Sequence, residues 1–195
     1  LCRYLYTMIY MDTQEQFRSV LAECRNLFVK KLHDYGASWR ILRPTSLTDQ
    51  IYIKACRIRT LETCGKALVD EGVKSEFVGI VNYAVIGLIQ LELGAAEARE
   101  DLGAAECLEE YDRHAGDAFN LMLRKNHDYG EAWRQMRVSS YTDLILMKVM
   151  RTKQIENLQG STLVSEGIDA NYMDIMNYAV FGLIKLTFGE DKVEE

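Results

Sequence analysis

The chain contains the same pattern twice, and this internal duplication constrains its fold more than any other feature. Residues 33–40 (HDYGASWR) return as residues 127–134 (HDYGEAWR), with six identical residues in eight and an offset of 94. Residues 82–89 (NYAVIGLI) return as residues 177–184 (NYAVFGLI) at an offset of 95, as one inserted residue would require. Two tandem copies of a unit of roughly 80 residues therefore account for nearly the whole chain.

Hydrophobic spacing predicts three helices in each unit. The chain has one proline and a hydrophobic fraction of 48%, with abundant helix-forming residues. In the first unit Gly36 and Gly94 mark helix ends, and Ser46 or Thr48 can cap the second helix. The expected helices are residues 12–34, 46 or 48 to 68, 75–93, 104–128, 141–160 and 170–188.

The third helix of each unit is apolar nearly all round and must therefore be buried. A three-helix unit cannot easily hide such a helix alone, so we expect the two units to pack together as a pseudo-twofold bundle, an intramolecular version of a homodimer. Gly87 and Gly182 would allow these helices to approach closely. The sequence thus predicts an all-α fold, a tandem duplication of a three-helix unit.

The same pattern divides the chain into five segments. Residues 1–10 are an apolar upstream segment, with a truncated signal peptide as the alternative. The first repeat spans residues 11–94 and the second residues 104–189. An acidic linker, which can itself be helical, covers residues 95–103, and an acidic tail covers residues 190–195.

Composition excludes several classes of protein. The five cysteines show neither CxxC nor zinc-finger spacing, which argues against a disulfide scaffold or a structural zinc site. No run approaches 18 uninterrupted apolar residues, so we expect no membrane-spanning helix and no membrane as a partner. The net charge of −6 argues against duplex nucleic acid as a partner. We expect a cytoplasmic protein that is able to form a homodimer.

The HDYGxxWR segment offers groups that suit a nucleotide. Tyr129 and Trp133 could clamp a planar base, while Arg134, like Arg40 in the first repeat, could reach phosphates. The structural alternative is that the tryptophans plug the end of the bundle and Asp128 holds nearby arginines or backbone N–H groups.

Lys148 and Arg151 lie one helical turn apart, as do Lys54 and Arg57, so each pair shares a face where it could neutralise phosphates. The alternatives are a solvated face or buried pairing with Glu156 and Asp143.

Asp174 and Asn177 also lie one turn apart, on the most apolar helix, where a carboxylate needs a partner or a cation. Glu156 and Glu166 are candidate partners for a magnesium site, because magnesium prefers oxygen ligands. The alternative is pairing of Asp174 with Lys148 or Arg151. The first repeat has Gly79 in place of Asp174, which suggests that only the second repeat holds a complete site.

Residues 125–133 (KNHDYGEAW), followed by Asp143, Lys148, Arg151, Glu166 and residues 174–179 (DIMNYA), resemble the nucleotide modification associated family, whose hallmark is a KNxDYGxAW segment. Residues 174–179 also resemble the last motif of all-α nucleoside triphosphate pyrophosphatases of the MazG and dimeric dUTPase type, which bind magnesium through acidic helix residues. Those enzymes carry an ExxE pair on the preceding helix, where this chain has Glu156-x-x-Gln159.

Together these patterns predict a nucleotide-binding protein in nucleotide metabolism or modification, in its enzymatic form a magnesium-dependent nucleoside triphosphate pyrophosphohydrolase. Asp174 and Glu156 would be catalytic, and would hold magnesium together with Glu166. The alternative is a non-catalytic scaffold or ligand sensor whose duplicated polar residues form a salt-bridge network. The expected substrate-binding residues are Lys148, Arg151, Trp133, Tyr129, Arg134, Asn177 and Asp128.

Overall fold

A computed structural model describes residues 12–65, 72–98, 101–160 and 166–189; the expected segments 1–10 and 190–195 lie outside these residues. In the described residues the chain forms six α-helices and two short 3-10 helices, and no strand. The helices are α1 (Thr13–Tyr35), η1 (Ser38–Ile41), α2 (Pro44–Cys64), α3 (Val73–Leu93), α4 (Ala104–Tyr129), η2 (Ala132–Gln135), α5 (Val138–Asn157) and α6 (Ile168–Phe188).

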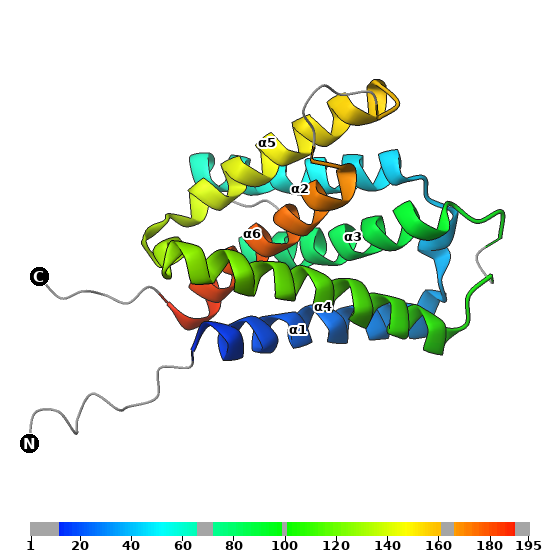
Figure 1. Ribbon diagram of the computed structural model, residues 1–195, viewed down its shortest axis with the longest axis horizontal. Coiled ribbons are helices and arrows are strands. Elements are labelled where there is room, and N and C mark those ends of the chain that lie inside the picture. Colours follow the sequence, from blue (N-terminus) through cyan, green and yellow to red (C-terminus); the bar gives the residue numbers. More distant parts are fainter. Residues whose placement is uncertain (1–11, 66–71, 99–100, 161–165, 190–195) are drawn as a thin grey trace, which may run out of the picture.

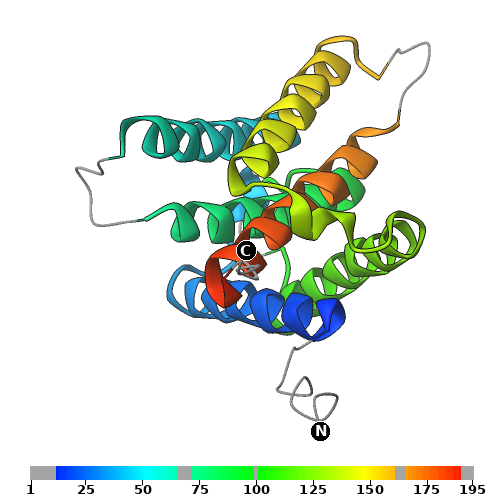
Figure 2. The ribbon, with the colours of Figure 1, turned by 90° about the vertical axis from the view of Figure 1, so that its left-hand side faces the viewer.

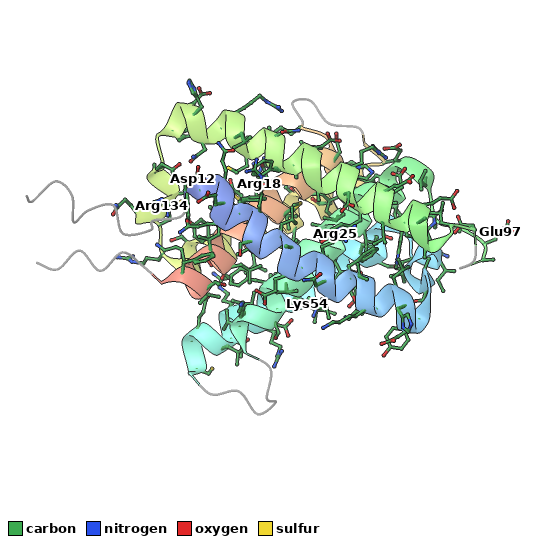
Figure 3. The ribbon with its side chains drawn as sticks, turned by 90° about the horizontal axis from the view of Figure 1, so that it is seen from below. Asp12, Arg18, Arg25, Lys54, Glu97 and Arg134 are labelled. Carbon is green, nitrogen blue, oxygen red and sulfur yellow. The ribbon has the colours of Figure 1, made fainter. Side chains whose placement is uncertain are left out.

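The α-helices pack in three layers, each with one helix from each repeat (Figures 1 and 2). The apolar helices α3 and α6 form the central layer, α2 and α5 cover one side of it, and α1 and α4 cover the other. Figure 3 shows α1 and α4 side by side. Arg25 of α1 pairs with Asp112 of α4 at 2.6 Å. This arrangement confirms the predicted all-α fold built from a duplicated three-helix unit.

The first helix begins and ends where its local sequence directs. Asp12 accepts a hydrogen bond from the backbone N–H of Glu15, and the Glu15 side chain accepts one from the backbone N–H of Asp12, which forms a capping box. Gly36 ends the helix with a φ of 62°, in the region that glycine enters at little cost. Both ends agree with the expected helix 12–34 to within a residue.

The predicted start of the second helix was wrong. α2 begins at Pro44 with Arg43 at the N-cap, because proline at the first helical position has the right φ and needs no hydrogen bond for its missing N–H. Neither Ser46 nor Thr48 is a cap. The helix also ends early, at Cys64, because Gly65 adopts a left-handed conformation.

The linker is not helical in its described residues, and a single arginine anchors it. Arg40 is 3% exposed; its guanidinium donates to the Gly94 carbonyl at 2.8 Å and pairs with Asp101 at 2.7 Å. The backbone N–H of Ala96 donates to the Arg40 carbonyl. Arg40 was expected to reach phosphates. It instead has a structural role, because it holds the linker between the two repeats in place.

Reciprocal polar contacts join α2 to α5 across the pseudo-twofold axis. Thr48 donates to Glu156 at 2.6 Å, and Thr142, its counterpart 94 residues later, donates to Glu62 at 3.0 Å. The ion pairs Lys153–Asp49 (2.5 Å) and Arg59–Asp143 (3.1 Å) are also counterparts, because their residues differ by the same offset of 94. The two repeats thus face each other as the subunits of an isologous dimer do.

Close ring contacts join α3 to α6 in the same reciprocal way. A Cβ placed on Gly87 would meet the ring of Tyr172 at 2.9 Å, and one placed on Gly182 would meet the ring of Phe77 at 3.0 Å. Phe77 and Tyr172 are counterparts at the offset of 95, and both are fully buried. The predicted role of the two glycines in close helix approach is confirmed.

Among the described residues one helix, α3, has the length and mean hydropathy of a membrane span. The most apolar 18-residue stretch of α3 has a mean hydropathy of 1.4, and 72% of this stretch is buried within the protein. Its burial in the central layer accounts for its apolar character without a membrane.

Candidate functional site

A pocket of about 280 Å³ lies in the second repeat, between the end of α4, η2 and α6. Its interior is mainly apolar, and two exposed side chains, Lys125 and Tyr129, contribute to its lining. Tyr129 is 73% exposed, whereas Asn177 is 5% exposed. The lining comprises Met122, Lys125, Asn126, Tyr129, Ala132, Trp133, Met136, Asp174, Asn177, Tyr178 and Phe181.

Two lysines share the carboxylate of Asp174. This side chain is buried on α6; one of its oxygens accepts from Lys125 at 2.5 Å, and the other pairs with Lys148 at 2.7 Å. Lys148 is itself buried and donates to Glu166 at 3.0 Å, and Arg151 lies 3.8 Å from the same carboxylate. Three cations therefore surround two carboxylates, and this cluster has a net positive charge that suits an anionic ligand. Only Lys125 and Asp174 of the cluster line the pocket, so the predicted binding residues Lys148 and Arg151 lie outside its lining.

Burial alone would lower the pKa of Lys148, but hydrogen bonds to Asp174 and Glu166 outweigh it and raise the pKa above its usual value. Lys148 therefore stays charged at neutral pH. This pairing is one of the alternatives that the sequence left open for Asp174.

Trp133 fills the pocket wall rather than standing open as a clamp. Its ring stacks on Phe181 at 4.4 Å between centroids, and the guanidinium of Arg134 lies 4.5 Å from its centre. Only 7% of Trp133 is exposed. The expected clamp of Tyr129 and Trp133 around a base is therefore corrected. The ring of Tyr129 is exposed, whereas both faces of the Trp133 ring are covered, so only the edge of this ring can meet a ligand.

Glu131, which the sequence analysis missed, organises the neighbouring loop. Its carboxylate accepts hydrogen bonds from Thr13, Asn126, Trp133 Nε1 and Arg134. Burial raises the pKa of Glu131, but these bonds together hold it below its usual value. Arg134 also donates to Thr13 and lies beside the start of α1 (Figure 3), so it joins the repeats rather than lining the pocket.

The expected magnesium ligands do not come together. In the described residues no group of three or more acidic, histidine or cysteine side chains could hold a metal ion. Glu156 accepts from Thr48 of the other repeat, while Asp174 lies between two lysines. A carboxylate already shared by two ammonium groups is a poor cation ligand, so these residues do not fit a magnesium ion.

Burial is the main cause that raises the pKa of Glu156, and the hydrogen bond from Thr48 opposes it. The residue belongs to the inter-repeat contact and does not line the pocket. Asp128 is also outside the lining; it is exposed and lies 3.2 Å from the ring of His127.

A second pocket, of about 470 Å³, occupies the equivalent place in the first repeat. Every lining residue of the 280 Å³ pocket except Met136 has its counterpart in this lining at the offset of 94 or 95. The counterparts include Lys31 for Lys125, Tyr35 for Tyr129, Trp39 for Trp133, Asn82 for Asn177 and Tyr83 for Tyr178.

The missing acid of the first repeat lies one helical turn earlier. Glu76 is buried on α3 and pairs with Lys54, at 3.1 Å, and with Arg57. Lys54 crosses Gly79, where a Cβ would meet its Cε at 2.6 Å. The first repeat therefore also has a buried carboxylate beside its lysine, supplied by Glu76 instead of a counterpart of Asp174.

Sequence reasoning gave no role to Lys125 or Tyr178, which line the pocket. The signal was present, since both recur at the repeat offsets as Lys31 and Tyr83. A comparison of the two copies restricted to polar and aromatic positions would have found them.

Comparison with known proteins identifies the repeats. The profile of a family described as Nucleotide modification associated domain 1 matches twice, over residues 31–91 and 125–186. No curated protein and no solved structure matches the chain, so the likeness to MazG-type pyrophosphatases is not confirmed. The two matched segments cover more than half of the chain and contain all the lining residues of the 280 Å³ pocket except Met122. The chain therefore belongs to the nucleotide modification associated domain 1 family and carries that domain twice.

Proposed function

We propose that the chain binds a nucleotide in the pocket of the second repeat. The observation that carries the proposal is the pocket itself, whose lining lies almost entirely within the second family match. Its interior is apolar, and the exposed Lys125 lies beside the net positive cluster around Asp174. Its volume of about 280 Å³ lies near the lower limit of small-molecule sites, which suits one base.

Each part of a nucleotide has a matching group in this arrangement. The base would enter between Tyr178 and the edge of Trp133, where aromatic side chains supply contact area. The phosphates would stay outside, near the exposed ammonium of Lys125. Lys125 would then exchange its pairing with Asp174 for the phosphate, while the buried Lys148 keeps Asp174 neutralised.

Calorimetric titration with adenosine and uridine 5′-triphosphates tests this proposal. Lys125→Met should weaken binding about tenfold or more, since a hydrogen bond to a charged group contributes about 1.5–3 kcal/mol. The neighbouring exposed cation Arg124 does not line the pocket, so Arg124→Met is the matched control and should bind as the parent does. No binding, or equal losses in both variants, would contradict the proposal.

The enzymatic form of the proposal, hydrolysis to pyrophosphate, is measured on the same samples with and without magnesium. Release of pyrophosphate that depends on magnesium and on Asp174 would support a pyrophosphohydrolase. Binding without release would support the ligand-sensor form.

A further inference from the structure

The pockets of the two repeats differ in the charged side chains that line them. In the second repeat these are Lys125 and Asp174, which pair with each other and whose charges cancel. In the first repeat they are Lys31, Lys54 and Glu76, two cations and one acid. The lining of the first pocket therefore has a surplus of positive charge, whereas the lining of the second is balanced.

Gly79 accounts for this difference. It stands at the position of Asp174, and its lack of a side chain lets Lys54 cross it. A Cβ on Gly79 would lie 2.6 Å from Cε of Lys54 and 3.0 Å from its Nζ. The counterpart Lys148 stays outside the lining of its pocket, with 7% of its side chain exposed against 25% for Lys54. The first pocket thus has an ammonium group where the second has a carboxylate.

The absence of an acid at position 79 also leaves Lys31 without a partner. Its counterpart Lys125 donates to Asp174 at 2.5 Å. Lys31 is exposed and forms no ion pair with any residue that the structure describes. An anion that reaches Lys31 therefore displaces no protein carboxylate, whereas an anion that reaches Lys125 must take it from Asp174.

Glu76 stays neutralised when Lys54 turns to a ligand. This carboxylate is 3% exposed, and it pairs with Lys54 at 3.1 Å and with Arg57. Arg57 lies outside the lining, so a ligand in the pocket leaves its pairing with Glu76 in place. An ammonium group has three donors, so Lys54 can also keep Glu76 while it donates to a phosphate. The pocket can therefore accept an anion without leaving a buried charge unpaired.

The rest of the first pocket suits an aromatic ring. The rings of Phe28, Trp39 and Tyr83 contribute to its lining, together with the exposed ring of Tyr35. Its volume is about 470 Å³, against about 280 Å³ in the second repeat, and lies within the usual range of small-molecule sites. The larger volume leaves room for a ring and a phosphate together.

We infer that the first repeat holds a second site, which takes an aromatic phosphate and draws its phosphate group into the pocket, onto Lys31 and Lys54. Nucleotides belong to this class of ligand. The site is separate from the one proposed for the second repeat, where the phosphates stay outside, and it does not depend on that proposal.

The fluorescence of Trp39 measures this site alone in a Trp133→Phe background, because the chain has two tryptophans and Trp39 is the one that lines the first pocket. Adenosine 5′-monophosphate, adenosine and inorganic phosphate are the probes. The monophosphate should bind about tenfold more tightly than either of the others, because only this probe supplies both the ring and the charged hydrogen bonds.

Lys31→Met tests the lysine that has no partner to lose. In the same background it should weaken binding of the monophosphate about tenfold and leave the affinity for adenosine unchanged. The neighbouring cation Lys30 is exposed but does not line the pocket, so Lys30→Met is the matched control and should bind as the background protein does. Equal losses in both variants would reflect overall charge alone and would overturn the site.

Gly79→Asp adds the carboxylate that the second repeat has. It should occupy Lys31 and Lys54 and weaken binding of the monophosphate about tenfold. The added Cβ meets only the flexible end of Lys54, so the fold should tolerate the change. Gly79→Ala crowds Lys54 in the same way but adds no charge, so it is the matched control and should lose less affinity.

Each outcome decides a separate point. Adenosine that binds at Trp39 as tightly as the monophosphate would overturn the entry of the phosphate, and inorganic phosphate that binds as tightly would overturn the aromatic part. No response of Trp39, with no heat of binding that Lys31→Met removes, would overturn the whole site. The nucleotide site proposed for the second repeat is tested separately through Lys125→Met, and none of these results bears on it.

Discussion

The contact of Gly87 with Tyr172 gives the sharpest test of the packing between the repeats. A Cβ on Gly87 would lie 2.9 Å from Cζ of Tyr172 and 3.1 Å from two further ring atoms, where carbon atoms normally stay about 3.5–4.0 Å apart. The ring cannot easily move aside. It is fully buried, and its hydroxyl donates to the Pro44 carbonyl at 3.1 Å and lies 2.7 Å from Thr48 Oγ1.

Two opposing effects set the magnitude for Gly87→Ala. Alanine gains about 1 kcal/mol over glycine in a helix interior. Overpacking of a rigid core costs about 1–3 kcal/mol, and the tethered ring places this site at the upper end. The net loss should be about 1–2 kcal/mol, which corresponds to a fall of about 2–8 °C in Tm for a chain of this size.

The matched control is Gly116→Ala. Gly116 also lies inside a helix, but a Cβ there would meet nothing within 4 Å. This variant should be stabilised by about 0.5–1 kcal/mol. Gly182→Ala should fall between the two, because its neighbour Phe77 approaches to 3.0 Å but has no hydroxyl to fix it.

Thermal unfolding followed by circular dichroism measures all three variants. The double variant Gly87→Ala with Tyr172→Phe removes the tether, so its loss should be smaller than the sum of the single losses. If Gly87→Ala raised Tm as much as Gly116→Ala does, the close approach of α3 and α6 would be refuted.

Three further predictions concern buried polar groups. Lys185 donates to the carbonyls of Arg134 and Met136, so Lys185→Leu should cost about 1–3 kcal/mol in urea unfolding; Lys185→Gln should cost less, since Gln90 makes the equivalent contacts in the first repeat. Asp174→Asn should lose about 3 kcal/mol whether or not magnesium is added, because it removes one partner of the buried Lys148; a small loss that appears only with magnesium would instead indicate a metal ligand. Burial raises the pKa of Glu156, so its ionised form destabilises the folded state at neutral pH, and Glu156→Gln should stabilise the protein at pH 7. This gain should shrink as the pH falls through the raised pKa of the folded state towards the pKa of the unfolded state. Unfolding measured at several pH values tests the trend, and a gain that grows at lower pH would contradict it.

The sequence predicted the helices and their duplication because periodicity and terminal glycines are local signals. Gly36 and Gly94 end their helices as expected, and the apolar helices α3 and α6 occupy the central layer. Local signals fail where a tertiary contact uses the same residue. Thr48 has the chemistry of a helix cap, but it is a buried donor to Glu156 of the other repeat.

The candidate site was predicted only in part, because the two copies were compared position by position. At a fixed offset Gly79 stands against Asp174, and the carboxylate of the first repeat looks lost. On a helix, residues three apart share a face, so Glu76 places its carboxylate on the same wall. The side chain of Lys54 passes over Gly79 and pairs with Glu76. The first repeat therefore keeps a lysine–carboxylate pair, although a position-by-position alignment of the repeats does not show one.

Unequal hydrogen bonding in the two pockets is hard to explain by stability alone. In the described residues four buried side-chain polar atoms lack a partner, on Gln16, Trp39, Asn171 and Asn177. Two of these residues line the pockets, at positions where the other repeat supplies the partner through Tyr111 or Glu131. Each such atom costs about 1–3 kcal/mol, and the other repeat shows which single residue type can remove that cost. Selection for stability alone should have kept the same partner in both repeats, yet each repeat carries one buried polar group whose cost the other repeat avoids.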